Sequence, residues 1–206
     1  ANMSHELRTP LNAIIGYAQI LQQNRSLDSK SKEYIRTMHK SGEHLLGMIN
    51  DILDLTKIET GHMTYKSEVF DLSSFLEDIY QMFKLRADDK QLDFTYQLDE
   101  NLPQVIKADV HKLRQVLINL ISNAIKYTPT GKVELSVLPK ESDKQEKFQA
   151  PQLVFKVSDT GIGIPEKDFE KIFTPFKQIE ENTQEGTGLG LSITSHIVSL
   201  MNGSIN

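Results

Sequence analysis

The sequence predicts an α+β protein in which an N-terminal helical hairpin precedes an α/β sandwich. Three observations lead to this fold class. Residues 1–60 carry apolar side chains at helical spacing. Beyond about residue 68, short alternating runs typical of strands are mixed with amphipathic helical runs. These elements alternate without the spacing of βαβ units, which favours helices packed on one sheet face. Because the pattern changes near residue 68, we expect domains over 1–66 and 67–206.

The first 60 residues are predicted to form two helices joined by a polar loop over 22–32. The first helix has apolar positions at Leu7, Leu11, Ile14, Ile15, Ala18 and Leu21. The second has them at Tyr34, Ile35, Met38, Leu45, Leu46, Ile49, Ile52, Leu53 and Ile58, and is expected to stop near Gly61. Each helix has one apolar face and a lone pair buries little surface. We therefore expect two copies of the chain to form a four-helix bundle.

The second domain is predicted from alternating strand and helix patterns. The expected elements are a strand at 70–72, a helix at 72–88, a strand at 92–98, a turn at Pro103, a helix at 109–127, strands at 132–138 and 153–158, a short helix at 168–173 and a final helix at 189–201. The charged segment 139–151 is expected to be an exposed hairpin loop. The glycine-bearing segment 177–188 is expected to be a mobile loop.

The composition excludes several functional classes. With 23 Lys and Arg against 28 Asp and Glu, the net charge is −5, which argues against non-specific binding to nucleic acid. The absence of cysteine excludes disulfides, thiolate metal sites and cysteine nucleophiles, and is compatible with a cytoplasmic location. No apolar run approaches the roughly 18 residues that cross a bilayer, so any membrane anchor is expected in parts of the parent protein outside this sequence.

Two asparagines are candidate ligands for a metal ion. Asn119 and Asn123 are four residues apart on one predicted helix and therefore share a face. An amide oxygen is a neutral hard ligand that suits Mg²⁺ when phosphate oxygens and waters complete its shell. Lys126 and Tyr127 follow one turn later, within reach of a phosphate. The alternative is that all four are ordinary polar positions on an exposed helix face.

Two glycine-bearing segments are candidate nucleotide sites. Asp159, with Gly161 and Gly163 behind it, follows a predicted strand, where a carboxylate can accept a hydrogen bond from an exocyclic amine and glycines allow close backbone approach. The segment 186–191 opens a helix, where backbone N–H groups favour phosphate. Neither segment matches a dinucleotide fingerprint or a P-loop, and each alone is also compatible with a simple turn.

Taken together and in this order, these segments resemble the ATP-binding domain shared by histidine kinases, type II topoisomerases, Hsp90-type chaperones and mismatch-repair ATPases. The sequences of these motifs are most similar to those of histidine kinases: 114–128 resembles their N box, 157–165 the G1 box, 168–176 the F box and 186–190 the G2 box. The resemblance implies that ATP and Mg²⁺ bind here. Asn123 would hold the ion with Asn119 in support, Asp159 would recognise adenine, and 177–188 would cover the phosphates. The implied nucleotide-binding residues are Asn119, Asn123, Lys126, Tyr127, Asp159, Gly161, Gly163, Phe176, Gly186, Thr187, Gly188, Leu189 and Gly190.

A histidine near the start of the chain distinguishes among these families. On its own, His5 followed by Glu6 is ordinary for a solvated helix face. The stretch 4–11, Ser-His-Glu-Leu-Arg-Thr-Pro-Leu, however, resembles the H box of the histidine-kinase dimerisation domain. The resemblance implies that His5 accepts the γ-phosphoryl group, that Glu6 is the general base and that Thr9 serves a phosphatase reaction. Pro10 removes a helix hydrogen bond, so a bend near His5 is expected.

The sequence as a whole resembles a two-component sensor histidine kinase. The implied reaction is autophosphorylation of His5, followed by transfer to an aspartate of a response-regulator receiver domain, within a homodimer formed by the N-terminal helices. One alternative is a mainly phosphatase or regulatory form. Another is a mechanical ATPase of the topoisomerase or chaperone kind, which leaves residues 1–60 unexplained. Because four residues precede His5 and a glycine-rich strand pair would follow in the family, with 204–205 resembling the first strand, we expect a longer parent protein.

Overall fold

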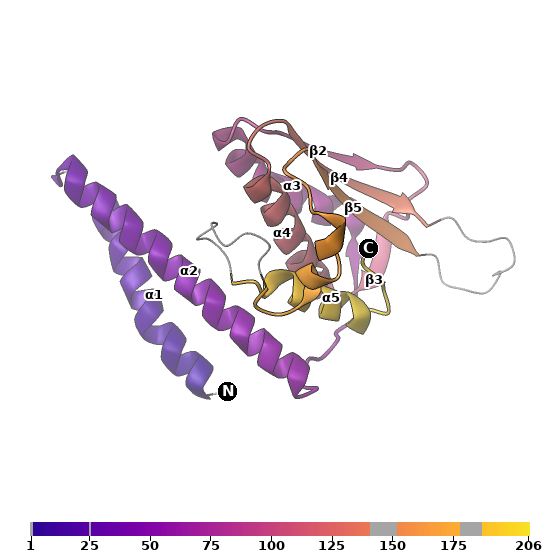
Figure 1. Ribbon diagram of the computed structural model, residues 1–206, viewed down its shortest axis with the longest axis horizontal. Helices are drawn as coiled ribbons and strands as arrows, with labels where there is room; N and C mark the ends of the chain where they lie inside the picture. Colours follow the sequence, from indigo (N-terminus) through magenta and orange to yellow (C-terminus); the bar gives the residue numbers. More distant parts are fainter. Residues whose placement is uncertain (1, 25, 141–151, 178–186) are drawn as a thin grey trace, which may run out of the picture.

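The computed structural model describes residues 2–24, 26–140, 152–177 and 187–206. It contains a long helical hairpin and an α/β part that packs beside it (Figure 1). The predicted hairpin followed by an α/β sandwich is therefore confirmed. Most of the two predicted loops, 139–151 and 177–188, lies outside the described residues, namely 141–151 and 178–186.

The hairpin consists of α1 (Asn2–Gln22) and α2 (Ser29–Glu59), which pack along each other. The Asp28 carboxylate caps α2 by accepting from the Ser31 backbone N–H at 2.8 Å. Past its C-terminal end, Gly61 adopts φ +67°, as predicted for a helix stop at this glycine. The helical assignment of α1 runs through Pro10 without interruption. The seam between the helices buries Leu11, Ala18, Ile35 and Gly42.

The α/β part contains two small sheets. Strand β1 (Glu68–Asp71) pairs antiparallel with β3 (Val105–Ala108), and the three-stranded sheet has the order β2-β4-β5. Within it, β2 (Asp93–Leu98) runs parallel to β4 (Lys132–Pro139), and β5 (Leu153–Asp159) runs antiparallel to β4. Strand β3 was not predicted, because it is only four residues long, lies between the turn at Pro103 and the next helix, and has no fully buried residue.

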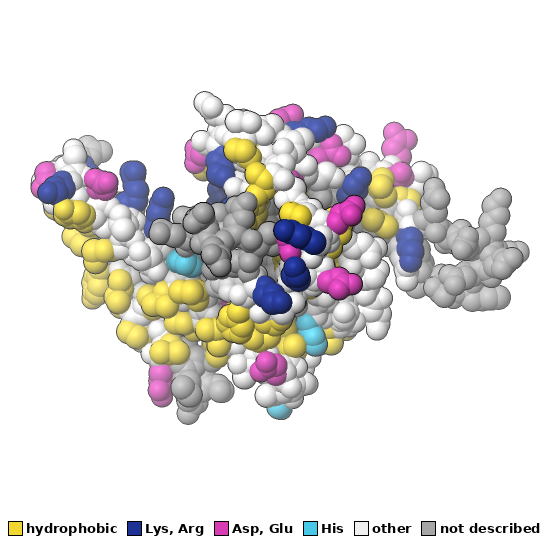
Figure 2. Space-filling view, in the orientation of Figure 1, with side chains coloured by type: hydrophobic (Ala, Val, Ile, Leu, Met, Phe, Trp, Pro, Cys, Tyr) yellow, Lys and Arg dark blue, Asp and Glu magenta, His cyan; other side chains and the backbone are white. Residues whose placement is uncertain are grey.

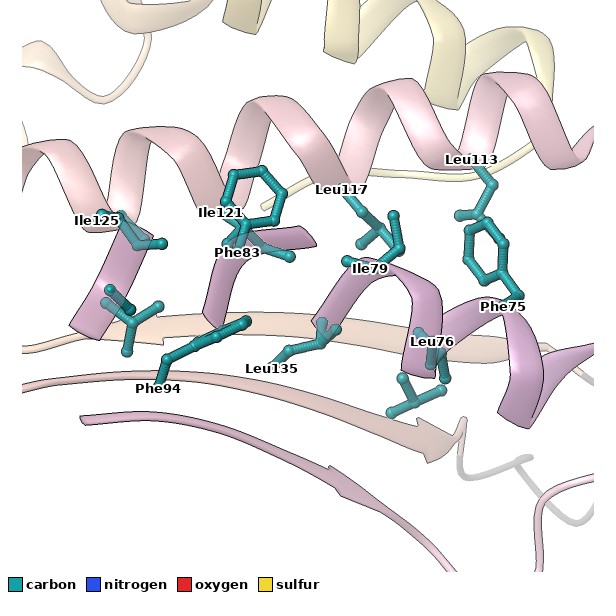
Figure 3. Packing of buried hydrophobic residues seen from close by; sticks show 14 of the residues in the cluster. Phe75, Leu76, Ile79, Phe83, Phe94, Leu113, Leu117, Ile121, Ile125 and Leu135 are labelled. Atoms are coloured by element: carbon teal, nitrogen blue, oxygen red, sulfur yellow. The ribbon is translucent and has the colours of Figure 1, made fainter. Parts of the chain in front are cut away.

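Helices α3 (Leu72–Asp89) and α4 (Val110–Tyr127) cover one face of the three-stranded sheet (Figure 1). Their apolar side chains pack against the inward side chains of β2 and β4. Figure 3 shows this packing, with Leu117 of α4 and Ile79 of α3 near Phe94 of β2 and Leu135 of β4. The fully buried members of this core are Leu76, Ile79, Ala87, Leu117, Ile121, Phe94, Val133, Leu135 and Val137. Burying each large side chain stabilises the fold by roughly 1.5–3 kcal/mol. This core fixes α4, the helix that carries both candidate asparagines.

The segment after β5 differs from its prediction. Instead of one short helix over 168–173, the structure has two single 3₁₀ turns, η1 (Glu166–Asp168) and η2 (Lys171–Phe173). Isolated helices of a few residues rarely hold an α-helical ladder, because nucleation fixes several dihedrals for one hydrogen bond. The expected strand start at 204–205 is also absent from the described residues, which are irregular there.

Helix α5 (Gly190–Leu200) joins the two parts of the chain. It packs against α2, α4 and η2. A second apolar cluster lies at this junction and comprises Met63, Val116, Leu189, Ile193 and Ile197, with Leu55 and Ile58 of α2 packed against it. The C-terminal half of α2 therefore rests directly on the helices that carry the candidate nucleotide site. No helix among the described residues is long and apolar enough to span a membrane.

Asp109 ties the connection between the two parts to the start of α4. Its carboxylate caps α4 by accepting from the Lys112 N–H at 3.0 Å, and it accepts from the Lys66 N–H at 2.8 Å. Burial alone would raise the pKa of Asp109, but these N–H donors outweigh it and hold the pKa below its ordinary value. The resulting stabilisation is present at neutral pH and is lost as the pH falls below about 4, where the carboxylate protonates.

We expect Asp109→Ala to lower the free energy of unfolding by about 2 kcal/mol, because it removes both a helix cap and the partner of the Lys66 N–H. For a chain of this length that corresponds to a Tm lower by about 4–8 °C in calorimetry at pH 7. Asp28→Ala is the matched control, since Asp28 caps α2 through exposed, local contacts only. Equal Tm losses for the two variants would contradict the tie across the connection.

Candidate functional site

The two asparagines of α4 have different surroundings. The Asn119 amide nitrogen donates to the Thr194 hydroxyl of α5 at 2.9 Å. Asn119 therefore joins α4 to α5. The half-buried Asn123 lies one turn further along α4, and no hydrogen bond joins its amide to any residue within the described ranges. Its amide oxygen thus has its lone pairs available for a ligand.

The end of α4 meets the loop that follows β5. The Tyr127 carbonyl accepts from the Ile162 N–H at 3.3 Å. The Lys126 ammonium lies 3.0 Å from the Tyr127 hydroxyl and 4.6 Å from the centre of its ring. One cation and one phenol therefore stand beside the Asp159 loop. The structure brings the residues predicted from two separate motifs together at this corner.

Asp159 is the last residue of β5 and is exposed. Its Oδ1 accepts from the Gly161 N–H at 2.8 Å, which leaves the remaining lone pairs of the carboxylate for another donor. Gly161 is required by close approach, since a Cβ there would collide with the Tyr127 carbonyl oxygen. Gly163 follows with φ +69°. The short turn thus presents a carboxylate at the edge of the sheet next to α4.

The F-box and G2-box predictions also meet in space. The Phe176 N–H donates to the Gly188 carbonyl at 3.0 Å. Gly188 has φ +68°, and a Cβ on it would lie 2.9 Å from the Phe176 carbonyl carbon, so a side chain there is strained and crowded. Phe176 itself has φ +63°, an uncommon conformation for a bulky residue, and 64% of it is exposed.

Thr187 sits at the start of the segment that leads into α5. Its hydroxyl oxygen accepts from the Leu189 N–H at 3.1 Å, next to Gly190, the first residue of the helix. Its O–H donates to Asp51 Oδ2 of α2 at 2.9 Å. Gly186, which was predicted to belong to this motif, lies outside the described residues.

Asp51 was not predicted as a site residue. Burial raises the pKa of its carboxyl, and so does the negative charge of Asp54, while the Thr187 hydrogen bond lowers it. Asp54 in turn accepts from the Gln115 amide of α4 at 2.9 Å. In the sequence these acids are only polar interruptions in the apolar pattern of α2, and nothing there indicates that a second element will pack against them.

The H-box residues lie on α1. His5 belongs to the second turn of that helix, and its side chain lies outside what the structure describes. Glu6 and Thr9 are exposed. Arg8 donates through Nε and Nη2 to Asn50 Oδ1 of α2, at 3.0 and 2.7 Å.

Helix α1, which carries the H-box residues, and the candidate nucleotide site lie on different sides of α2. Helix α2 packs against α1 on one side and against α5 on the other (Figure 1). Residues predicted from the N, G1, F and G2 boxes gather around α4 and the start of α5. The structure does not bring His5 and Glu6 to that cluster within one chain.

Comparisons with known proteins agree with this division. Residues 108–206 match the family model of the histidine kinase-, DNA gyrase B- and HSP90-like ATPase. Residues 1–61 match the family model of the His Kinase A (phospho-acceptor) domain. The two models thus match the hairpin and the α/β part from the end of β3 onward, and residues 62–107 lie between the two matches.

Individual relatives cover the whole chain. The circadian input-output histidine kinase CikA of Synechococcus elongatus is 43% identical over 213 residues, covering 100% of this chain and 27% of the relative. The autoinducer 2 sensor kinase/phosphatase LuxQ of Vibrio vulnificus is 39% identical, covering 100% of this chain and 24% of the relative. The crystal structure of full-length ShkA in complex with AMPPNP aligns with a TM-score of 0.76 at 31% identity, covering 98% of this chain and 40% of ShkA. The chain thus spans about a quarter of the length of these curated relatives.

Proposed function

The chain belongs to the sensor histidine kinase family, and we propose on this premise that it transfers the γ-phosphoryl group of ATP to its own His5. One observation carries the proposal beyond family membership. Asn123, the Asp159 turn and the Gly188–Thr187 corner come from separate parts of the sequence and lie around α4 and its contact with α5. A helix that begins with a phosphoacceptor motif packs on the other side of α2.

The adenine end of ATP is proposed to lie at the Asp159 turn. The carboxylate is exposed, and one of its oxygens is already fixed by the Gly161 N–H at 2.8 Å. An ordered acceptor of this kind can receive a hydrogen bond from an exocyclic amine with little loss of side-chain entropy. Gly163, which completes the turn, and Tyr127 at the end of α4 border the same corner. The complex of ShkA with AMPPNP, an analogue of ATP, supports the same class of ligand.

The phosphate end is proposed to lie along α4 and the start of α5. Lys126 brings a positive charge to the last turn of α4. At the other border, the backbone of Gly188, Leu189 and Gly190 opens α5, where N–H groups favour an anion. Phe176 fixes that corner by its hydrogen bond to Gly188. This polarity, with adenine at Asp159 and phosphates toward Thr187, would present the γ-phosphate on the side that faces the hairpin.

Asn123 is proposed to hold Mg²⁺, with Asn119 in support. The Asn123 amide has no hydrogen-bond partner among the described side chains and backbone groups, whereas Asn119 is held by Thr194. A single neutral oxygen ligand suits Mg²⁺, which keeps waters and phosphate oxygens in its shell. When bound, the ion would neutralise charge on the phosphates.

The chemistry at His5 is nucleophilic substitution at phosphorus. One imidazole nitrogen forms a bond to the γ-phosphorus while the bond from that phosphorus to the bridging oxygen breaks, and ADP leaves with the electron pair. Glu6 accepts the proton from the other ring nitrogen, which keeps the attacking nitrogen nucleophilic. Because α2 separates α1 from the ATP site within this chain, the transfer requires either movement of the ATP part or the His5 of a second chain.

A homodimer is proposed to form through the hairpin. Exposed apolar side chains follow both helices, and Figure 2 shows hydrophobic side chains gathered along the hairpin. They border a hollow lined by Ile14, Tyr17, Ala18, Leu21, Ile35 and Met38. Covering this surface with a second hairpin yields the four-helix bundle expected from the sequence.

The receiver of the phosphoryl group is proposed to be an aspartate of a response regulator, with Thr9 orienting water in the reverse, phosphatase reaction. The name of LuxQ, a kinase/phosphatase, supports a double activity of this kind. A cytoplasmic location is proposed for these residues because ATP is the substrate. Any membrane attachment would reside in further parts of the parent protein.

Incubation of the chain with γ-labelled ATP and Mg²⁺ tests the proposed reaction. We expect label that survives base and is lost in acid, as a phosphorus–nitrogen bond requires, and we expect no label on His5→Gln. His44→Gln, which replaces an exposed histidine on the same hairpin, should label like wild type. Equal label on wild type and His5→Gln would overturn the kinase assignment. Steady ATP hydrolysis without any phosphoprotein would favour the mechanical-ATPase alternative.

A further inference from the structure

The contact between α2 and the G2 segment has a feature that the proposed reaction does not use. The Thr187 hydroxyl donates to the Asp51 carboxylate at 2.9 Å, across the junction between the hairpin and the α/β part. Both side chains are half-buried. A carboxylate therefore stands against the residue that leads into the proposed phosphate site.

The charge of Asp51 opposes a nucleotide. The carboxylate and a triphosphate are both anionic, and at short range in a half-buried setting like charges are weakly screened. The Thr187 hydroxyl has a single proton to donate, and that proton is committed to Asp51. A phosphate oxygen at this corner has to displace the carboxylate to gain the same donor.

We propose that Asp51 is an autoinhibitory latch, which holds Thr187 and the start of α5 against α2 and which the phosphates of ATP displace. The inference rests on the proposed function, because it requires that the Thr187 corner receives phosphates. Its consequence is a negative coupling between the Asp51–Thr187 contact and binding of nucleotide. ATP binding then breaks this contact and frees the Thr187 corner from α2, while the other polar contact at the junction, Asp54 with Gln115, remains.

The position of the latch connects it to the phosphoacceptor helix. Asn50, the residue before Asp51, accepts both hydrogen bonds from Arg8, which lies three residues after His5. Adjacent residues of α2 therefore hold the H-box helix on one side and the G2 segment on the other. One turn of α2 thus holds both α1, through Asn50, and Thr187, through Asp51, and so connects nucleotide binding at Thr187 with the position of α1.

A second polar contact at the same junction provides a comparison. Asp54 of α2 accepts from the Gln115 amide of α4 at 2.9 Å. This bond also ties the hairpin to the α/β part, but Gln115 lies two turns before Asn123 on α4 and belongs to none of the proposed phosphate contacts. Its loss would loosen the docking without freeing the Thr187 hydroxyl.

The test is the dissociation constant of the imido analogue of ATP with Mg²⁺, measured by calorimetry on the full chain. We expect Asp51→Ala to tighten binding about tenfold, within the usual range of coupling between sites. Asp51→Asn, which fits the same space, should tighten binding by a smaller factor, because the amide still accepts a hydrogen bond without carrying charge. Gln115→Ala should bind within about twofold of wild type, and in a Thr187→Val background Asp51→Ala should add no effect.

The outcomes separate the latch from the proposed function. If wild type binds the analogue and neither Asp51 variant binds it more tightly, the latch is overturned while the ATP site stands. Equal tightening by Gln115→Ala and Asp51→Ala would also overturn it, because general loosening of the junction would then explain the gain. If neither wild type nor the variants bind the analogue, the proposed function fails and the latch fails with it.

Discussion

Replacing Asp159 with Ala is expected to weaken ATP binding about 10- to 100-fold and to reduce autophosphorylation in proportion at subsaturating ATP. The reason is the loss of a charge-assisted hydrogen bond to adenine, which contributes roughly 1.5–3 kcal/mol. Calorimetry with the imido analogue measures the affinity. Replacing ATP with GTP supplies a second reading, since a site that selects the adenine amine rejects a base that carries a carbonyl there.

Asp99→Ala is a matched control for this loss. Asp99 accepts from the N–H two residues on, at 2.8 Å, in the same way as Asp159 accepts from Gly161. It follows β2 at the opposite end of the sheet, because the register pairs Leu98 with Val137 and Asp159 with Val133. Asp99→Ala therefore removes an equivalent turn bond away from the site. If both variants lose equal affinity for ATP, Asp159 acts only through its turn, and adenine recognition by this carboxylate is wrong.

Replacing Asn123 with Ala is expected to lower the rate of autophosphorylation about 10²- to 10³-fold, because a protein ligand of Mg²⁺ is lost and the ion stabilises the transferring phosphoryl group. The affinity for the analogue measured in EDTA should stay unchanged. The gain in affinity that Mg²⁺ gives to wild type should shrink or disappear. Together these readings distinguish a metal ligand from a residue that contacts the nucleotide alone.

The neighbouring Ser122 supplies the control, because Ser122→Ala alters an exposed position of the same helix and should leave rate and affinity as in wild type. Asn119→Ala has a different expected signature. It breaks the hydrogen bond to Thr194 and so loosens α5 from α4, which should lower thermal stability as well as activity. An Asn123→Ala variant that retains the full rate and the full response to Mg²⁺ would contradict the assignment of the metal ligand.

The helices and most strands could be predicted because their burial follows the sequence pattern. Leu117 and Ile121 are fully buried where the helical period places them, and Val133, Leu135 and Val137 alternate inward as expected for a strand. The 3₁₀ turns at 166–173 and the strand Val105–Ala108 could not be predicted in the same way. Each is three or four residues long, too short for a period to be recognised.

The residues of the candidate nucleotide site could be found because they belong to short, contiguous sequence motifs. Asp159, Gly161 and Gly188 stand in turns whose geometry requires those residue types. Asp51 could not be found, because its role arises only when α2 packs against the start of α5, about 136 residues later in the chain. A partly buried acid on a helix carries no local signal of the element that will cover it.

ATP is proposed to phosphorylate His5 and no other side chain, and fragmentation mass spectrometry of the chain after incubation with Mg²⁺ and ATP locates the phosphoryl group. With samples kept neutral to alkaline, we expect a phosphoryl group on the peptide that contains His5 and none on the peptides with the other five histidines. The amount of phosphorylated His5 peptide should be about 10- to 100-fold lower when Asp159→Ala is assayed at subsaturating ATP for the same short time. A phosphoryl group on another residue, with His5 unmodified, would contradict the claim.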